Sequence, residues 1–154
     1  PLDYEPSDLV DIPARFVARD DRTLQLRREA CDALVRMLGA ALADDVDIQV
    51  NSAYRSGSRQ EQIYRRNVRR NPGQRSSARP GHSEHQLGTT VDLTDPPGEY
   101  GFSQEFVDTP QGQWLEQHAH EFGFRRTYYP ENDEETGYIP EPWHWRYMGD
   151  ALSR

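Results

Sequence analysis

The sequence predicts an α+β fold, a single domain in which a small, mainly antiparallel sheet is flanked by helices. Its 154 residues suit one compact domain with one core. Segments of helical and of alternating periodicity follow one another without the regular strand–helix–strand rhythm of a parallel α/β protein. Only 34% of the residues are hydrophobic, so we expect the aromatic residues, 10% of the chain, to supply much of the core.

Three segments carry the signals of helices. Apolar residues recur at helical spacing from Thr23 to about Ala43, which predicts a helix packed on the core. Ser56 or Ser58 is expected to cap a second helix that runs to about Arg70. Thr109-Pro110 provides a cap and a first helical residue for a third helix, which Gly123 ends.

Short strands complete the predicted domain, at residues 47–54, 89–93, 124–128 and 143–148. Residues 71–84 are rich in Pro, Gly and Ser and are expected to form a loop. Residues 1–22 contain three prolines and show no clear period, so we expect an arm that packs on the domain formed by residues 23–154.

Composition excludes several functions. The net charge of −8 argues against a general nucleic-acid binder, and we interpret the arginine run at residues 65–70 as a solvated helix face. Because all eighteen basic residues are Arg, a Ser-Lys peptidase mechanism is excluded. The single cysteine, Cys31, lies among apolar residues and is expected in the core. The chain has no apolar run long enough to span a bilayer.

Two short segments place histidines next to carboxylates. In residues 81–92, Asp92 should point away from the apolar face of its strand, and a tight turn at Gly88 would let it converge with His85. In residues 141–147, His144 should point away from the aromatic face of the last strand, and Pro142 lets Glu141 turn towards the same pocket. His118 and His120 lie two residues apart near a helix end, where surface or capping roles suit them.

These residues have the stoichiometry of a catalytic zinc site, which is two His, one carboxylate and a water. Zinc lowers the pKa of its water towards about 7, and a neighbouring base such as Glu141 would take the proton. The zincin motif of two His flanking a Glu on a helix is absent, so the spacing alone leaves a structural role open for each His.

Three blocks of sequence, in order, carry a resemblance to a known family. They are Ser52-Ala53-Tyr54-Arg55-Ser56 with Gln60, the segment from Pro80 to Asp92, and Glu141-Pro142-Trp143-His144-Trp145-Arg146-Tyr147. Together they resemble the VanY-type D-alanyl-D-alanine carboxypeptidases and their relatives, the L,D-carboxypeptidases. The blocks extend over residues 52–147, which is most of the chain.

The resemblance implies a domain of the zinc D,D-peptidase type, related to hedgehog, with one zinc ion. It implies that His85, Asp92 and His144 bind the zinc, that Glu141 is the catalytic base, and that Arg55 polarises the scissile carbonyl or holds the substrate. Gln60 and Ser83 match positions that line the substrate site. Thr89-Thr90 departs from the small or aliphatic residues of many relatives, and we expect this to alter packing only.

The expected reaction is removal of the terminal D-Ala from peptidoglycan stem peptides that end in D-Ala-D-Ala. Since peptidoglycan lies outside the cytoplasmic membrane, we expect an exported or membrane-tethered enzyme, acting as a monomer. Alternatives are an L,D-carboxypeptidase on tetrapeptide stems, an endopeptidase, and a relative that binds peptidoglycan without catalysis. A serine hydrolase using Ser83, Asp92 and His144 is a further alternative, although the final Gly of a nucleophile elbow is replaced by His85.

Overall fold

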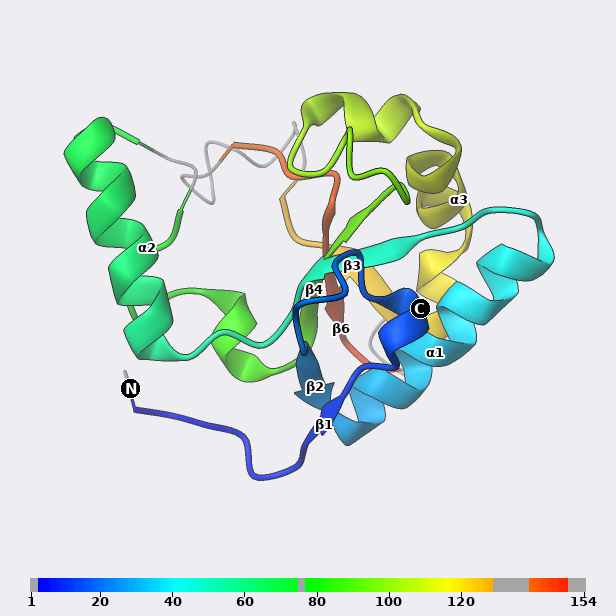
Figure 1. The fold of residues 1–154 in the computed structure, drawn as a ribbon, viewed down its shortest axis with the longest axis horizontal. Coiled ribbons are helices and arrows are strands. Elements are labelled where there is room, and N and C mark those ends of the chain that lie inside the picture. Colours follow the sequence, from blue (N-terminus) through cyan, green and yellow to red (C-terminus); the bar gives the residue numbers. More distant parts are fainter. Residues whose placement is uncertain (1–2, 75–76, 129–138, 150–154) are drawn as a thin grey trace.

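The computed structural model describes residues 3–74, 77–128 and 139–149, and its centre is an antiparallel sheet of four strands (Figure 1). The strand order is β3-β4-β6-β5, and every neighbouring pair is antiparallel. The strands are β3 (Gln49–Ser52), β4 (Thr90–Thr94), β5 (Phe124–Arg126) and β6 (His144–Tyr147). A separate two-stranded sheet pairs β1 (Leu9–Asp11) with β2 (Gln25–Arg27). The predicted α+β class with an antiparallel sheet is confirmed.

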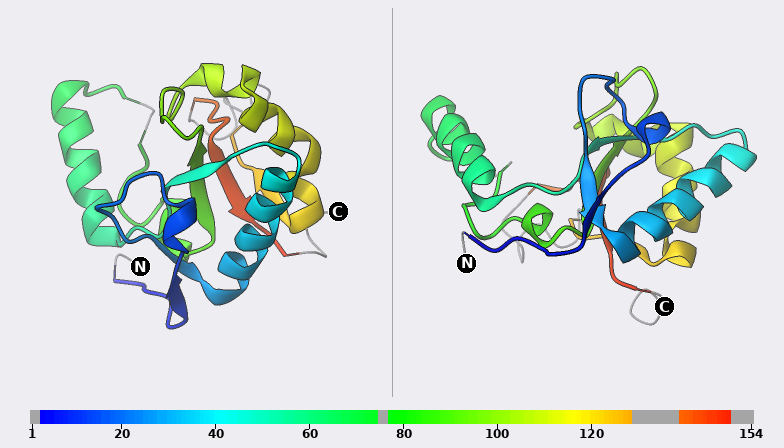
Figure 2. Two further views of the ribbon diagram at one scale, coloured as in Figure 1. Left: turned by 45° about the vertical axis from the view of Figure 1, so that its right-hand side comes forward. Right: turned by 60° about the horizontal axis from the view of Figure 1, so that its bottom comes forward.

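Helices lie on both sides of this sheet. The views in Figures 1 and 2 place α1 (Arg28–Ala43) and α3 (Pro110–His118) on one side, and α2 (Gly57–Arg70) on the other. Short 3-10 helices connect the main elements: η1 (Ala14–Phe16), η2 (Glu84–Leu87), η3 (Gln104–Asp108) and η4 (Ala119–Phe122). Among the described residues, none of the helices is both long and apolar enough to cross a membrane.

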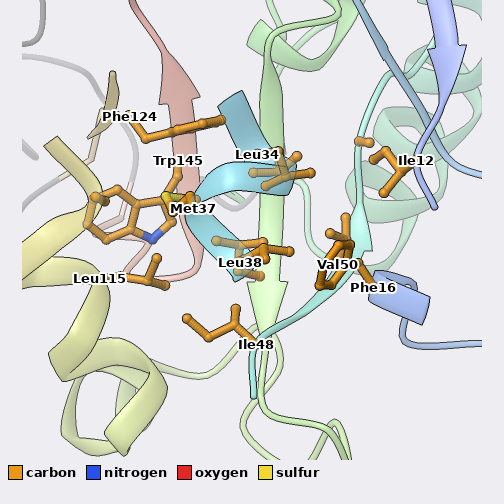
Figure 3. Packing of buried hydrophobic residues seen from close by; sticks show 14 of the residues in the cluster. Ile12, Phe16, Leu34, Met37, Leu38, Ile48, Val50, Leu115, Phe124 and Trp145 are labelled. Carbon is orange, nitrogen blue, oxygen red and sulfur yellow. The ribbon is translucent and has the colours of Figure 1, made fainter. Parts of the chain in front are cut away.

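The hydrophobic core fills the space between α1, α3 and one face of the sheet (Figure 3). Leu34, Met37 and Leu38 of α1 are fully buried there. From the sheet, Val50, Val91, Leu93, Phe124 and Trp145 meet them. In contrast, α2 buries only Gly57 and Gln60, so it contributes a wall on the opposite side of the sheet instead of filling the core.

The first helix begins later than the sequence predicted. Residues 25–27 form β2, and α1 starts at Arg28 rather than at Thr23. Leu26 pairs with Val10 across the β1–β2 ladder and is completely buried. Leu26 fits the helical spacing of apolar residues in the sequence, but it belongs to a strand in the structure. Its tertiary contacts outweigh the local helical periodicity.

The predicted helix caps are confirmed. The hydroxyl of Ser56 accepts a hydrogen bond from the backbone N of Arg59, 3.2 Å away, and α2 begins at the next residue. Thr109 caps α3 through Gly112 N at 3.0 Å, with Pro110 in the first turn. The end of the third helix was predicted too late, because α3 ends at His118 and Gly123 instead ends η4, with φ of 85°, a conformation that favours glycine.

Residues before the first helix pack on the domain. Ile12, Phe16 and Val17 are part of the main core, and Val17 forms a bridge to Val50 of β3. The division of the chain into an arm of residues 1–22 and a domain of residues 23–154 remains a prediction.

The N-terminal segment also packs against the turn at Gly88, which connects η2 with β4. Gly88 follows η2 with φ of 73°, and a Cβ there would lie 3.0 to 3.3 Å from side-chain atoms of Arg27, Pro6 and Leu9. Arg27 N donates to Gly88 O over 2.8 Å, and Gln86 Nε2 donates to Tyr4 O over 3.1 Å. The turn between η2 and β4 is therefore packed beneath residues that are far away in sequence.

Two glycines provide a matched test of the packing. A Cβ on Gly112 would lie 2.0 Å from the backbone O of Phe106, whereas Gly39 in α1 has no neighbour within 4 Å of such an atom. We expect Gly112→Ala to destabilise the fold by about 1–3 kcal/mol because α3 must move away from η3. Gly39→Ala should stabilise it by about 0.5–1 kcal/mol through helix propensity. Urea unfolding of both variants measures this, and equal stabilities would contradict the observed packing.

Candidate active site

Strand register brings two of the predicted ligands together. In the β4–β6 ladder, Asp92 lies directly opposite His144, and Val91 lies opposite Trp145. Because alternate residues of a strand point to opposite faces, the apolar pair packs into the core while Asp92 and His144 share the other face. The predicted placement of these two side chains is confirmed.

The third predicted ligand comes from η2. Ser83 caps this turn, its hydroxyl accepting from His85 N at 3.2 Å, and Arg55 N donates to His85 O over 3.0 Å. The ring of His85 is held by a 2.7 Å hydrogen bond between Nδ1 and the carbonyl of Ala53. Both the backbone and the imidazole of His85 are thereby fixed to the end of β3.

His85, Asp92 and His144 form a buried cluster in which one ligand atom from each lies within 4.8 Å of the others. His85 Nε2 is 3.2 Å from Asp92 Oδ2, and His144 Nδ1 is 3.3 Å from Asp92 Oδ1. Although Asp92 Oδ1 is buried, it accepts no well-aligned hydrogen bond from the described residues. Such an oxygen requires a partner, and a cation between the three side chains would supply one.

The two imidazoles are oriented to present lone pairs to this point. His85 directs Nδ1 to the Ala53 carbonyl, which can only accept, so the proton lies on Nδ1 and the lone pair on Nε2. His144 directs Nε2 to the carboxylate of Glu84 over 2.8 Å, so Nδ1 is the nitrogen that could offer a lone pair to a metal. Two nitrogens and one carboxylate oxygen are ligands that zinc prefers. The residues present therefore fit a zinc ion.

The electrostatics of the cluster also favour a cation. Burial alone would raise the pKa of Asp92, but the two neighbouring imidazoles hold it well below its usual value. Burial would lower the pKa of His144, but Asp92 and Glu84 raise it to about 10. The raised pKa means that His144 Nδ1 also carries a proton when no metal is bound. A divalent cation would displace this proton and satisfy the same negative field.

Glu141 lies beside the cluster, next to His144. Its Oε2 is 3.5 Å from His144 Nδ1, and the side chain is 14% exposed. In the part of the chain that the structure describes, no hydrogen bond ties down its carboxylate. Burial raises the pKa of Glu141 to about 7, so this carboxyl group can accept and return a proton near neutral pH.

Arg55 reaches the same space from the end of β3. It donates to Gln60 Oε1 over 2.8 Å and to Ser52 Oγ over 3.0 Å. Gln60 is 1% exposed, and its Nε2 donates to the carbonyl of Ala78. Both ends of the Gln60 amide are thus hydrogen-bonded within the protein, and these contacts suit a residue that holds Arg55 in place. The role of Gln60 in substrate binding remains a prediction.

A cavity of about 510 Å³ opens over these residues. Its sheet side is acidic, with Glu84, Asp92 and Glu141, whereas α2 contributes Arg59 and Arg66. The arginine run is therefore divided: Arg65 forms an exposed pair with Glu61, as expected for a solvated face, while Arg66 lines the cavity. Other lining residues include Ser83, Arg55, Gln60, Phe102, Tyr128, Trp143 and Ile139.

An aromatic residue at the cavity has an unusual backbone. Phe102 has φ of 59°, a conformation that costs energy for a bulky side chain, and it is 55% exposed. Its ring stands edge-on to Trp143 with centroids 5.9 Å apart. Trp143 immediately precedes His144, so this aromatic pair forms an apolar wall next to the cluster.

The sequence analysis gave no role to Glu84, Tyr128 or Phe102, although all three line the cavity. The ring centroid of Tyr128 lies 5.0 Å from that of His144. Glu84 contacts His144 directly. Its position between Ser83 and His85 in the second block is the feature of the sequence that could have identified it as a site residue. Phe102 lies outside the three blocks, and no feature of its local sequence distinguished it.

The remaining histidines lie elsewhere. The ring of His118 lies tilted against that of Trp114 and contacts Glu121, while His120 is exposed in the first half of η4. The serine hydrolase alternative lacks a base in the described residues, because the nitrogens of His144 face Glu84, Asp92 and Glu141, and Ser83 Oγ caps η2.

Comparison with known sequences agrees with this geometry. The chain is 37% identical over 161 residues to YodJ of Bacillus subtilis (strain 168), a match to 100% of this chain and 58% of that protein. It is 36% identical over 125 residues to a D-alanyl-D-alanine carboxypeptidase of Enterococcus faecalis (strain ATCC 700802 / V583), covering 73% and 44%. The chain thus spans less than two thirds of the length of either relative.

Solved structures show the same fold. The LdcB LD-carboxypeptidase superposes with a TM-score of 0.91 at 34% identity, covering 99% of this chain and 73% of LdcB. A mutant of the vancomycin resistance D,D-pentapeptidase VanY, in complex with Zn(II), superposes with a TM-score of 0.71 at 30% identity, covering 93% and 85%. The zinc complex among these structures belongs to VanY, whose fold this chain shares. Residues 23–150 match the VanY D-alanyl-D-alanine carboxypeptidase pattern, and the chain belongs to that family.

Removal of one candidate ligand tests the cluster. We expect His144→Ala to lose bound zinc, because Asp92 and His85 alone leave the ion with two protein ligands. His118→Ala, in a partly exposed helix-end position, should keep it. Metal content after dialysis measures both variants, and an unchanged zinc content in His144→Ala would show that the third ligand lies elsewhere.

Proposed function

We propose that this protein is a zinc-dependent carboxypeptidase that releases the terminal D-Ala from peptidoglycan stem peptides, with D-Ala-D-Ala ends as its substrate. One observation carries the proposal. His85 Nε2, Asp92 and His144 Nδ1 converge on one point at the wall of the cavity, and the carboxylate of Glu141 lies 3.5 Å from His144 without a hydrogen bond from the described residues. Family membership supports the same reaction.

His85, Asp92 and His144 would hold the zinc ion. When bound, zinc lowers the pKa of a water molecule and polarises the scissile carbonyl. Glu141 takes a proton from the attacking water as its oxygen adds to the carbonyl carbon. As the carbon–nitrogen bond breaks, Glu141 returns that proton to the nitrogen of the departing D-Ala. Burial raises the pKa of Glu141, which favours a group that both accepts and returns a proton.

Arg55 offsets the negative charge that develops on the carbonyl oxygen or holds the substrate carboxylate. Burial lowers the pKa of Arg55 from its usual value, but an arginine remains charged, and Ser52 and Gln60 fix the direction of its guanidinium. A preorganised cation of this kind is worth more in a cavity shielded from water than at the surface. Gln60 and Ser83 would help to position the peptide along the cavity wall.

A second candidate is L,D-carboxypeptidase activity, the removal of D-Ala from a tetrapeptide stem. The similarity to LdcB favours it, because that superposition covers 99% of this chain. The same ligands and base would serve either reaction, so the choice depends on how the cavity receives the residue before the cut. Endopeptidase activity and binding of peptidoglycan without catalysis are the further alternatives.

Peptidoglycan lies outside the cytoplasmic membrane, so the proposed substrate places the protein in the cell envelope. We propose that it acts there as an exported or membrane-tethered monomer.

The proposed reaction is tested by D-Ala release from matched pentapeptide and tetrapeptide stems, with a chelator and with zinc added back. We expect release from the pentapeptide that stops with the chelator and returns with zinc. Faster release from the tetrapeptide would assign the L,D reaction instead. Zinc-loaded protein that releases D-Ala from neither stem would refute a carboxypeptidase of this kind.

Glu141 is tested separately from the metal. Glu141→Gln should keep its zinc but lose about 100-fold or more in kcat, because an amide cannot accept and return the proton. Glu105→Gln makes the same chemical change at an exposed residue of η3 and should leave kcat unchanged. Zinc content and D-Ala release are measured on both, and a kcat near normal in Glu141→Gln would remove this residue from the role of base.

A further inference from the structure

We propose that Glu84 is a positioning residue for the metal site, which holds His144 so that Nδ1 faces the metal and fixes β6 relative to the turn that carries His85. The inference rests on the metal site proposed above. It concerns a residue to which neither the sequence analysis nor the proposed mechanism gives a part.

Both oxygens of Glu84 are engaged. Oε1 lies 2.8 Å from His144 Nε2 and accepts a 2.6 Å hydrogen bond from the hydroxyl of Thr127. Oε2 accepts a 2.7 Å hydrogen bond from Arg146 Nη1. The side chain is 14% exposed, so these bonds are largely shielded from water. Hydrogen bonds to a shielded, ionised carboxylate are among the stronger ones in proteins.

The contact with His144 decides which nitrogen is available to a metal. An ionised carboxylate can only accept, so Glu84 requires a proton on Nε2 and leaves Nδ1 as the nitrogen that can bind a metal. Nδ1 is the nitrogen that lies 3.3 Å from Asp92 and 3.5 Å from Glu141. Without Glu84, the ring could adopt the other tautomer or rotate, and the lone pair would leave the cluster.

Glu84 also joins three parts of the fold. His144 and Arg146 are alternate residues of β6 and so share a face of the strand, and Thr127 follows β5 directly. Glu84 itself begins η2 and is the neighbour of His85 in the chain. One carboxylate therefore links the turn that presents the first ligand to the strand that presents the third. The distance between the two histidines depends on this link.

The contacts separate Glu84 from Glu141. Glu84 lies at the Nε2 edge of the His144 ring, while Asp92 and Glu141 lie at the Nδ1 edge. Three donors already occupy its oxygens, so it has little capacity to take a proton from a substrate or water. Its effect on the reaction passes through His144.

The test compares the zinc affinities of metal-free wild type, Glu84→Gln and Glu61→Gln, measured by competition with a chromophoric chelator. We expect Glu84→Gln to bind zinc about 10- to 100-fold more weakly, as removal of such a partner of a metal ligand does. Glu61→Gln makes the same chemical change in an exposed pair with Arg65 and should bind like wild type. An unchanged affinity in Glu84→Gln would overturn the proposal.

Thr127 provides a second, milder probe if Glu84→Gln folds poorly. Thr127→Val removes the hydroxyl that donates to Glu84 and should weaken zinc binding several-fold, whereas Thr127→Ser keeps the hydroxyl and should restore it. Thermal unfolding of the metal-free variants verifies that they are folded. Equal zinc affinities for Thr127→Val and Thr127→Ser would also count against the proposal.

Kinetics distinguish positioning from substrate contact. With saturating zinc, Glu84→Gln should recover most of its kcat, whereas Glu141→Gln should not. A raised KM with unchanged zinc affinity would assign Glu84 to the substrate site and overturn the inference. Wild type that binds zinc but releases no D-Ala would refute the proposed reaction and leave the role of Glu84 intact. Wild type that binds no zinc would refute both.

Discussion

The register between β4 and β6 is the constraint on which the rest of this structure depends. It sets Asp92 opposite His144 on one face while Val91 and Trp145 enter the core on the other. A slip of one residue would exchange these faces, burying the carboxylate in the core and exposing the tryptophan. The free energy of burying the apolar face therefore also holds the polar pair in place, so the stability of the core and the geometry of the site have one cause.

Much of this arrangement follows from local sequence. Strand alternation was sufficient to direct Asp92 and His144 to one face, and the Gly88 turn brought His85 towards them. Helix ends were predictable because caps act within one turn, as at Ser56 and Thr109. The caps depend on contacts within one turn, and alternation along each strand sets the face of each side chain. The pairing of β4 with β6 and the hydrogen bonds of His85 to Ala53 and Arg55 join distant residues.

Other features depend on contacts between distant residues and could not be predicted. The start of α1 is set by pairing between Leu26 and Val10, which local periodicity does not contain. Gln60 is buried because α2 lies against the segment at Ala78, so its amide faces the protein. Glu84 contacts His144, sixty positions away, and the strained Phe102 meets Trp143. The sequence identified the candidate ligands but not the residues that hold them in place.

The cover over the Gly88 turn has a consequence for how relatives can diverge. The match to the family pattern begins at residue 23, yet the turn that leads from His85 to β4 is packed beneath Pro6 and Leu9, and Gln86 Nε2 donates to Tyr4 O. A segment outside the family pattern thus packs against the turn that carries the candidate ligand His85. Two relatives could have identical motifs but different N-terminal segments, and His85 would then be held with different rigidity. The motif residues alone therefore do not determine the geometry of the whole site.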